Sequence, residues 1–330
     1  MDTAQELRLG TRGSQLALWQ ANTVAARIAA AGGPPCRIIV IKTDGDRLQD
    51  RPLSELGGKG LFVKEIEDAL LGGAIDLGVH SSKDMSAVLP EGLTIAGVLA
   101  RENPLDAIVL PVRTGSARLQ TDLVASMDDL ARRFGDAPSI GTGSVRRIAQ
   151  LMRLFPGARF SGIRGNLDTR LRKLDEGAHD ALVLAAAGLT RLGFASRISL
   201  AVPAEACVPA PGQGIVAIEI RADDARARDA VSRINDAAAG DALAAERALL
   251  QTLGGGCQTP VGALASIVED GQLEIVAVVA ALDGSRVIRG RARAARQDAA
   301  ALGARVGVQL LADGARDILA DAQRAQESGR

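Results

Sequence analysis

Aromatic residues are scarce in this sequence: they make up 2% of its 330 residues, and tyrosine is absent. Proteins that bind single-stranded nucleic acid commonly stack the bases on aromatic side chains. Because such platforms are scarce here, binding of nucleic acid by stacking is disfavoured. The core must be built from Ala, Leu, Val and Ile, which supply most of the 47% of residues that are hydrophobic.

An excess of charge of one sign is also lacking, since 39 Lys and Arg residues balance 39 Asp and Glu residues. This balance removes any global electrostatic argument for nucleic acid or a membrane surface as partner. No apolar run reaches the roughly 18 residues that a membrane-spanning helix needs. The first residues contain no basic stretch followed by an apolar one. We therefore expect a soluble protein that is not exported and works in the cytoplasm.

Cysteine is limited to three residues, Cys36, Cys207 and Cys257, which lie far apart. They form no CxxC or His-rich spacing, so neither a disulfide framework nor a metal site is predicted. Cys36 and Cys207 are expected to be small buried hydrophobic residues. Cys257 follows three glycines in "LGGGCQTPVG", which is a poor place to bury a thiol. Such a backbone can approach a ligand closely, which suits a thiol that carries a covalent group.

Strands and helices alternate over the first two thirds of the chain, which predicts an α/β fold. A strand at 6–12 precedes a helix for which Ser14 is the candidate N-cap. After a polar stretch near 112–120 the pattern restarts as a second α/β unit, and the Pro- and Gly-rich residues 209–214 suggest a crossing back. From about residue 238 a helix, three strands and a final helix over about 298–320 predict a small α+β domain.

The segment 140–173 holds eight Arg or Lys residues against one acid, Asp168. Arg dominates, and its planar guanidinium matches a carboxylate or phosphate with two hydrogen bonds. Arg146 and Arg147 follow "GTGS" at a predicted helix start, where backbone N–H groups also favour an anion. The alternative is a solvated helix face, but partners of opposite sign are missing from the segment. An anion site is therefore favoured.

The segment "DLGVHSSKDMS" places His80, Ser81, Lys83 and Asp84 at the carboxyl end of a buried strand, where open α/β sheets bind ligands. Taken alone, Asp84 would more often be a turn or cap residue and His80 a core histidine. A carboxylate that faces a pocket built for anions is better explained as an acid, a base or the counter-ion of a cationic centre.

Eight motifs in order resemble those of porphobilinogen deaminases, also called hydroxymethylbilane synthases. They are "GTRGSQLALWQ", "GGKGLFVKEIEDALL", "VHSSKD", "GTGSVRR", "IRGNLDTRL", "LAAAGLTRLG", "PAPGQG" and "GGGCQTPVG". The resemblance implies three domains: two type II periplasmic-binding-protein-like α/β domains and a small α+β domain that carries the cysteine. Their expected ranges are 1–112 with 214–234, then 113–213, then 235–330. Ser82, Ser86 and Gly143 depart from residues that the family often has.

The resemblance also implies the chemistry. Four porphobilinogen molecules would condense head to tail, each losing ammonia to form an azafulvene, on a dipyrromethane cofactor held by a thioether to Cys257. Hydrolysis would then release the linear tetrapyrrole, and Asp84 would be the catalytic carboxylate. The cofactor-binding residues implied are Cys257, Lys83, Asp84, Ser144, Arg146 and Arg147. The substrate-binding residues implied are Arg12, Ser14, Lys59, Phe62, Ser81, Arg164, Arg170, Arg191 and Gln213. The segment 44–60 resembles the family's active-site lid, and a monomer is implied.

Two alternatives come from other classes of protein. A non-catalytic anion-binding module of the periplasmic type would explain the arginines and the two α/β units, but it would need neither Asp84 nor Cys257 and should carry an export signal. A phosphoryl-transfer enzyme would need a phosphate loop, and "GGKG" at 57–60 does not match GxxxxGK[ST].

Overall fold

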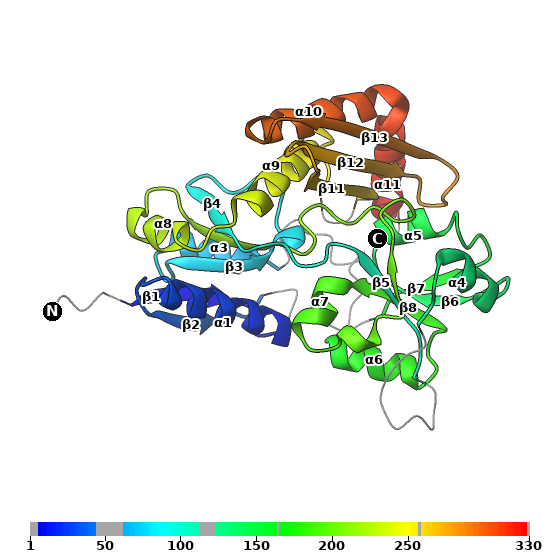
Figure 1. The fold of residues 1–330 in the computed structure, drawn as a ribbon, viewed down its shortest axis with the longest axis horizontal. Helices are drawn as coiled ribbons and strands as arrows, with labels where there is room; N and C mark the ends of the chain where they lie inside the picture. The colour runs from blue at the N-terminus through cyan, green and yellow to red at the C-terminus, as the bar shows by residue number, and fades with distance from the viewer. Residues whose placement is uncertain (1–5, 44–61, 113–122, 164, 257–258, 329–330) are drawn as a thin grey trace.

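The computed structural model describes residues 6–43, 62–112, 123–163, 165–256 and 259–328, which form three β-sheets with their helices (Figure 1). The first sheet has the order β2-β1-β3-β10-β4. Its strands are β1 (Leu7–Thr11), β2 (Cys36–Val40), β3 (Leu77–Ser81), β4 (Leu93–Val98) and β10 (Val216–Arg221). Its helices are α1 (Gln15–Ala30), α3 (Lys64–Leu71) and α8 (Ala225–Ser232). β1 runs parallel to β2 and β3, whereas β10 is antiparallel to its neighbours.

The second sheet repeats this plan with the order β7-β6-β8-β5-β9. Its strands are β5 (Asp106–Val109), β6 (Ser139–Gly141), β7 (Arg159–Ser161), β8 (Ala181–Ala185) and β9 (Leu200–Val202). Its helices are α4 (Met127–Phe134), α5 (Val145–Leu151), α6 (Leu167–Asp175) and α7 (Ala186–Arg191), with the short η2 (Ala195–Arg197) after them. In each sheet the antiparallel strand, β10 or β5, arrives from the other unit. This exchange confirms the predicted pair of type II periplasmic-binding-protein-like units.

The chain crosses between these sheets twice. The return crossing lies where residues 209–214 predict it, because β10 joins the first sheet between β3 and β4. The outward crossing differs from the prediction, since β5 pairs with β8 and β9 although it falls within 1–112. Its four residues are all buried, so β5 reads as a core strand of either unit from sequence alone. The polar stretch that suggested the linker comes after β5 and lies partly outside the described residues.

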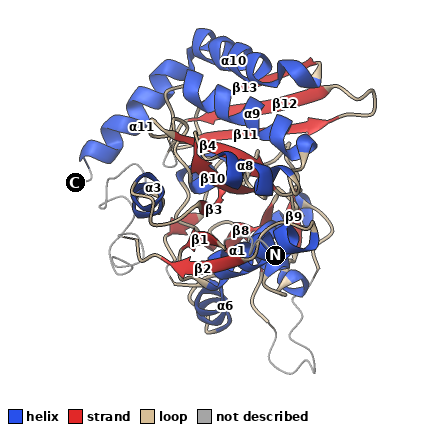
Figure 2. Ribbon diagram, turned by 90° about the vertical axis from the view of Figure 1, so that its left-hand side faces the viewer, coloured by secondary structure: helices blue, strands red, loops and turns tan. Residues whose placement is uncertain are grey.

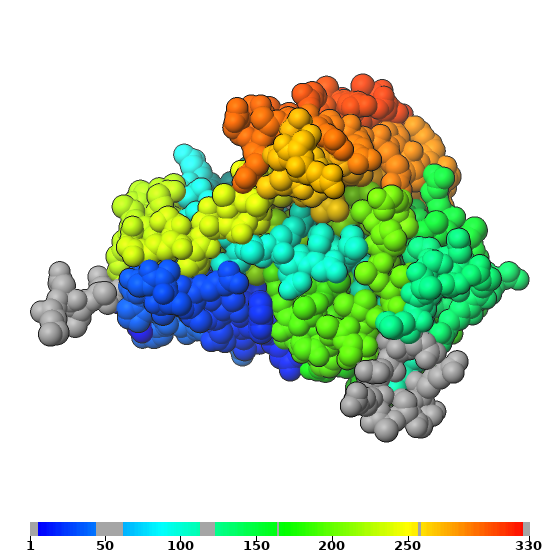
Figure 3. Space-filling view, viewed as in Figure 1, coloured from blue at the N-terminus to red at the C-terminus, as the bar shows by residue number. Residues whose placement is uncertain are grey.

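The third unit is an antiparallel sheet, β11-β12-β13, covered by helices (Figure 2). Its elements are α9 (Ala237–Thr252), β11 (Val261–Ile267), β12 (Leu273–Ala280), β13 (Val287–Ala294), η3 (Arg296–Asp298), α10 (Ala299–Leu310), η4 (Leu311–Ala315) and α11 (Arg316–Ser328). The helix expected over about 298–320 is broken at Gly314, whose φ of 102° is left-handed. This unit lies across the other two (Figure 3).

Local sequence explains the helix starts that matter for the site. Ser14 caps α1, as predicted, because its Oγ accepts a hydrogen bond from the backbone N–H of Ala17 at 3.3 Å. Ser144 caps α5 in the same way. Within the described ranges no helix is long and apolar enough to cross a bilayer.

Candidate functional site

The turn after β3 carries the predicted catalytic carboxylate. β3 ends at Ser81, and the short helix η1 (Ser82–Asp84) follows. The Ser81 hydroxyl accepts a hydrogen bond from Gln20 Nε2 of α1 at 2.8 Å. The Lys83 Nζ donates to Gln213 Oε1, on the return crossing, at 3.4 Å. The turn that bears Lys83 and Asp84 is therefore held between α1 and the crossing.

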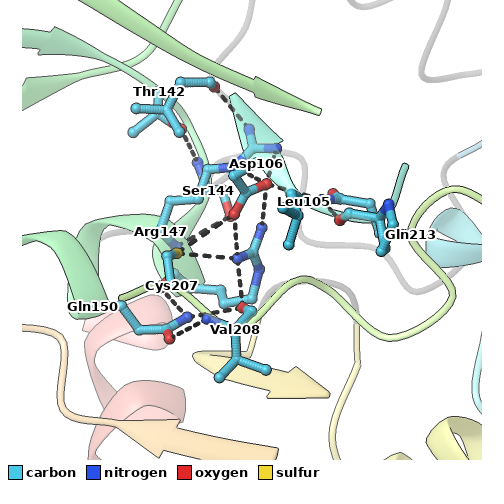
Figure 4. Close-up of polar contacts among 12 residues, drawn as sticks. Leu105, Asp106, Thr142, Ser144, Arg147, Gln150, Cys207, Val208 and Gln213 are labelled. Atoms are coloured by element: carbon cyan, nitrogen blue, oxygen red, sulfur yellow. Dashed lines mark hydrogen bonds and ion pairs between the residues drawn. The ribbon is translucent and has the colours of Figure 1, made fainter. Parts of the chain in front are cut away.

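Arg146 and Arg147 of α5 are both buried, and they share one partner that the sequence interpretation lacked (Figure 4). Asp106, at the start of β5, accepts from Arg146 Nη1 and from Arg147 Nη2, each at 2.7 Å. Burial by itself would raise the pKa of Asp106, but the two guanidinium charges outweigh it and hold the pKa well below its usual range. The expectation that these arginines lack a partner of opposite sign is wrong, because Asp106 lies outside the segment 140–173.

A cavity of about 50 Å³ lies between the three units. Residues from each unit line it: Ser82, Lys83, Met85, Ser144, Arg146, Ala210, Pro211, Leu243, Arg247, Leu250, Gly256, Thr259 and Val261. Two of its lining residues have a buried polar atom without a hydrogen-bond partner among the described residues, namely Ser82 Oγ and Arg146 Nε. Buried donors are normally paired, so these atoms indicate a binding position for a polar group.

Lys83 is partly exposed to solvent by area, yet protein atoms surround its ammonium closely. Burial lowers the pKa of Lys83 to about 8, with the positive charges of Arg146 and Arg147 acting in the same direction. Asp84 and Asp106 oppose this shift by raising the pKa. Within the described residues this ammonium donates to Gln213 Oε1 at a long 3.4 Å, so it is well placed to receive a carboxylate as well.

Two other predicted substrate residues, Arg12 and Arg191, each lie against an aromatic ring. The Arg12 guanidinium stands 4.2 Å from the centre of the Phe62 ring, so the structure brings these two residues together. Arg191 lies 5.4 Å from the centre of the Trp19 ring. Its Nη2 donates to the carbonyl of Gly214 at 2.7 Å, and burial lowers its pKa.

Two predicted residues are engaged within the protein. Gln213 is 1% exposed, and its Nε2 donates to Pro104 O at 2.7 Å and to Asp106 Oδ1 at 2.9 Å. Arg170 Nε donates to Gly165 O at 2.8 Å, near the start of α6. Four predictions lie outside the described residues: Lys59, Arg164, Cys257 and the lid over 44–60. Gly256, which directly precedes Cys257, is described and lines the cavity.

Three residues of this site were not found from the sequence. Asp106 lies in an apolar strand segment with nothing to mark a buried carboxylate. Arg247 lies in α9, and its Nη2 donates to Ala87 O at 2.8 Å while the side chain lines the cavity. Ser82 was noted only as a departure from the family. The sequence could have indicated Arg247, because it lies one helical turn from both Leu243 and Leu250 and therefore shares their buried side of the helix.

Both described cysteines were predicted to be buried, and one of them is fully buried. Cys207 is fully buried, as predicted, and burial raises the pKa of its thiol to about 12. Cys36 is half-buried, and burial raises the pKa of its thiol to about 11. Neither thiol is therefore a nucleophile at neutral pH. No group of three or more His, Cys, Asp or Glu in the described ranges is placed to hold a metal ion.

The donor chemistry of the cavity fits a dipyrromethane that carries acetate and propionate arms. Lys83, Arg146 and Arg247 supply positive charge, and Ser82 and Ser144 supply hydroxyl groups. The unpartnered Ser82 Oγ and Arg146 Nε are atoms that a carboxylate can satisfy.

Comparisons with known proteins agree with this chemistry. Residues 7–229 match the model for "porphobilinogen deaminase, dipyromethane cofactor binding domain", and residues 241–312 match that for "porphobilinogen deaminase, C-terminal domain". The porphobilinogen deaminase of Syntrophobacter fumaroxidans is 44% identical over 98% of this chain and 100% of its own length. That of Geobacter metallireducens is 41% identical over 96% of this chain and 95% of its own. The chain belongs to the porphobilinogen deaminase family.

Proposed function

We propose that this chain joins four porphobilinogen molecules head to tail, with loss of ammonia, and releases the linear hydroxymethylbilane by hydrolysis. It thereby acts as a transferase of tetrapyrrole and haem biosynthesis. One observation supports this most strongly. Cationic and hydroxyl side chains from three units converge on a cavity that Gly256 lines, and Gly256 directly precedes Cys257.

The dipyrromethane, bound covalently to Cys257, supplies the pyrrole carbon onto which the first substrate is joined. Because cationic and hydroxyl side chains line the cavity, we assign to it the acidic arms of the group. Lys83, Arg146 and Ser144 hold these arms by charge-assisted hydrogen bonds, and Ser82 contributes a further hydroxyl. Arg147 helps to hold Arg146 in place, since its guanidinium donates to Asp106, the partner of Arg146, and to Val183 O.

Asp84 acts at the reacting centre. Its carboxylate accepts hydrogen bonds from pyrrole N–H groups of the substrate and stabilises the positive charge that develops as ammonia leaves. It also assists transfer of the proton that the new carbon–carbon bond releases. Lys83, its neighbour, stays protonated at neutral pH and keeps an acidic arm beside the carboxylate.

Substrate carboxylates are bound along the junction of the first two units. The positions proposed are Arg12, Ser14, Lys59, Phe62, Ser81, Arg164, Arg170 and Arg191. Gln213, predicted with them, is buried with both ends of its amide bonded inside the protein, so we propose that it supports Lys83 instead. Arg12 and Arg191 each lie against an aromatic ring, which keeps the guanidinium plane oriented. We propose three domains with the ranges predicted above, except that residues 106–112 belong to the second. The enzyme works as a monomer in the cytoplasm.

The test is turnover of porphobilinogen by the purified full chain and by Asp84→Asn. General acid–base groups typically contribute about 10²- to 10⁴-fold, so the variant should lose at least about 10²-fold in kcat. Asp68→Asn removes an exposed carboxylate from α3 and serves as control, with wild-type turnover expected. A wild-type protein that binds porphobilinogen without consuming it would instead support the anion-binding module. Full activity in Asp84→Asn would refute the role given to Asp84.

A further inference from the structure

Asp106 gathers more hydrogen bonds than a simple ion pair requires. Its carboxylate is fully buried and accepts from Arg146 Nη1 and Nη2, Arg147 Nε and Nη2, Gln213 Nε2 and Cys207 Sγ. These donors come from α5 and from the connection between β9 and β10, and Figure 4 labels Arg147, Cys207 and Gln213 around Asp106. One carboxylate thus fixes side chains from two separate segments.

Gln213 extends this network from the second unit to the first. Its amide nitrogen donates to Asp106 Oδ1 at 2.9 Å, while its amide oxygen accepts from Lys83 Nζ at 3.4 Å. Because Gln213 is 1% exposed, water does not compete for these bonds. The amide therefore connects the buried carboxylate to the ammonium beside Asp84.

The network reaches the cavity. This distinguishes it from an ion pair that only stabilises the fold. Arg146 and Lys83 both line the cavity. Bidentate contact with Asp106 fixes the plane of the Arg146 guanidinium, and the Nε atom of that group has no partner among the described residues. Without Asp106, two guanidinium groups would be buried beside a third positive charge, an arrangement that would force their side chains apart.

We propose that Asp106 is a positioning residue for the condensation reaction: it orients Arg146 and Arg147, and through Gln213 also Lys83, toward the acidic groups of the bound pyrrole chain. The inference rests on the proposed function, because it assigns those groups to the cavity. The competing explanation is that Asp106 only stabilises the second unit.

The test uses Asp106→Asn in the full chain, since Asn keeps the shape of Asp and removes its charge. Two readouts report on positioning: the fraction of protein that carries the cofactor, measured by intact mass, and kcat of the loaded fraction. We expect the loaded fraction to fall, and kcat of the loaded fraction to fall at least tenfold.

A third readout is the basic limb of the pH profile of kcat, which follows deprotonation of Lys83. The charged groups around this ammonium are Asp84 in the same turn, Arg146 and Arg147 on α5, Asp106 on β5, and Arg247 on α9, which lines the same cavity. Asp106 raises the pKa of Lys83, and the value of about 8 already includes this effect, so loss of this charge should move the limb to lower pH. A purely structural role would leave the limb in place.

Asp175→Asn is the matched control. Asp175 pairs with Arg197 in the same unit, at 2.7 and 3.1 Å, and the Arg197 side chain is 7% exposed. Neither residue lines the cavity. This variant should lose stability but keep the loaded fraction, kcat and basic limb of the wild type.

An Asp106→Asn protein with kcat within twofold of wild type and an unmoved basic limb would overturn the proposal. If that variant does not fold, Gln213→Met keeps the pairs of Asp106 with Arg146 and Arg147 and removes the hydrogen bonds that the Gln213 amide makes with Lys83, Asp106 and Pro104 O. It should fold and shift the limb to lower pH, and an unmoved limb would overturn the proposal there too. A wild type without bound cofactor or turnover would instead refute the proposed function before any variant is compared.

Discussion

Substitution of Glu246 should destabilise the protein strongly, because its carboxylate ties together the three units. The side chain is fully buried on α9 and pairs with Arg101 of the outward crossing, whose Nη1 lies 2.6 Å from Oε1. The same carboxylate accepts from the backbone N–H of Gly212, on the return crossing, at 2.5 Å and from that of Ala265, on β11, at 2.7 Å. Both crossings are therefore bonded to the third unit through one residue.

The magnitude follows from the partners left behind. Removing one member of a buried ion pair costs about 3–5 kcal/mol, because the other charge stays buried without compensation. In Glu246→Ala two backbone N–H groups also lose their acceptor, and each such loss costs about 1–3 kcal/mol when no water replaces it. Since Arg101 is 12% exposed and can recruit water, we expect a total loss at the lower end of this sum, about 5 kcal/mol.

The assay is urea denaturation followed by far-UV circular dichroism. Asp229→Ala provides the comparison, since Asp229 pairs with Arg233 on the surface with exposures of 66% and 43%. An exposed pair of this kind contributes about 0.5 kcal/mol or less. A loss below about 1 kcal/mol in Glu246→Ala would refute the claim that this carboxylate holds the units together.

Three further predictions concern packing, the junction of the first two units, and pH. Gly303→Ala should cost about 2 kcal/mol or more of unfolding free energy in the same urea assay, because a Cβ there would stand 1.9 Å from a carbonyl oxygen of α9. Porphobilinogen should change the emission of Trp19, the only tryptophan, in a fluorescence titration of the wild type but not of Arg191→Ala. Burial would raise the pKa of Asp76, yet hydrogen bonds and charge from Arg8 lower it to about 2. This pair therefore stabilises the fold above the unfolded pKa of about 3.9. The wild type should lose that stability as the pH falls from about 4 to about 2, and thermal melts of Asp76→Asn should lack this part of the pH dependence.

Much of the fold could be predicted because its signals are local. Apolar runs separated by amphipathic helices indicate the α/β units, and Ser14 marks a helix start by its position alone. The prolines and glycines of 209–214 mark the return crossing. β5 shows the limit of such local signals, because an apolar sequence predicts that a strand is buried but not which sheet it joins. The outward crossing was therefore placed too late in the chain.

The site was predicted less completely for the same reason. Asp106 is 40 residues from Arg146, and only the pairing of β5 with β8 brings the two together. A count of charges within 140–173 could not reveal this partner. Outside the site, the helix break at Gly314 was not predicted either, because the apolar pattern continues across it while its backbone leaves the helical region. Local composition thus predicted an anion site but not the buried carboxylate that contacts both arginines.

The most direct test of the account is the intact mass of the purified, denatured protein beside that of Cys257→Ser. The account predicts a wild-type mass excess equal to two porphobilinogen units less two ammonia molecules, and no excess in the variant. A wild type without this excess, even after incubation with porphobilinogen, would contradict the covalent cofactor on which the proposed reaction depends.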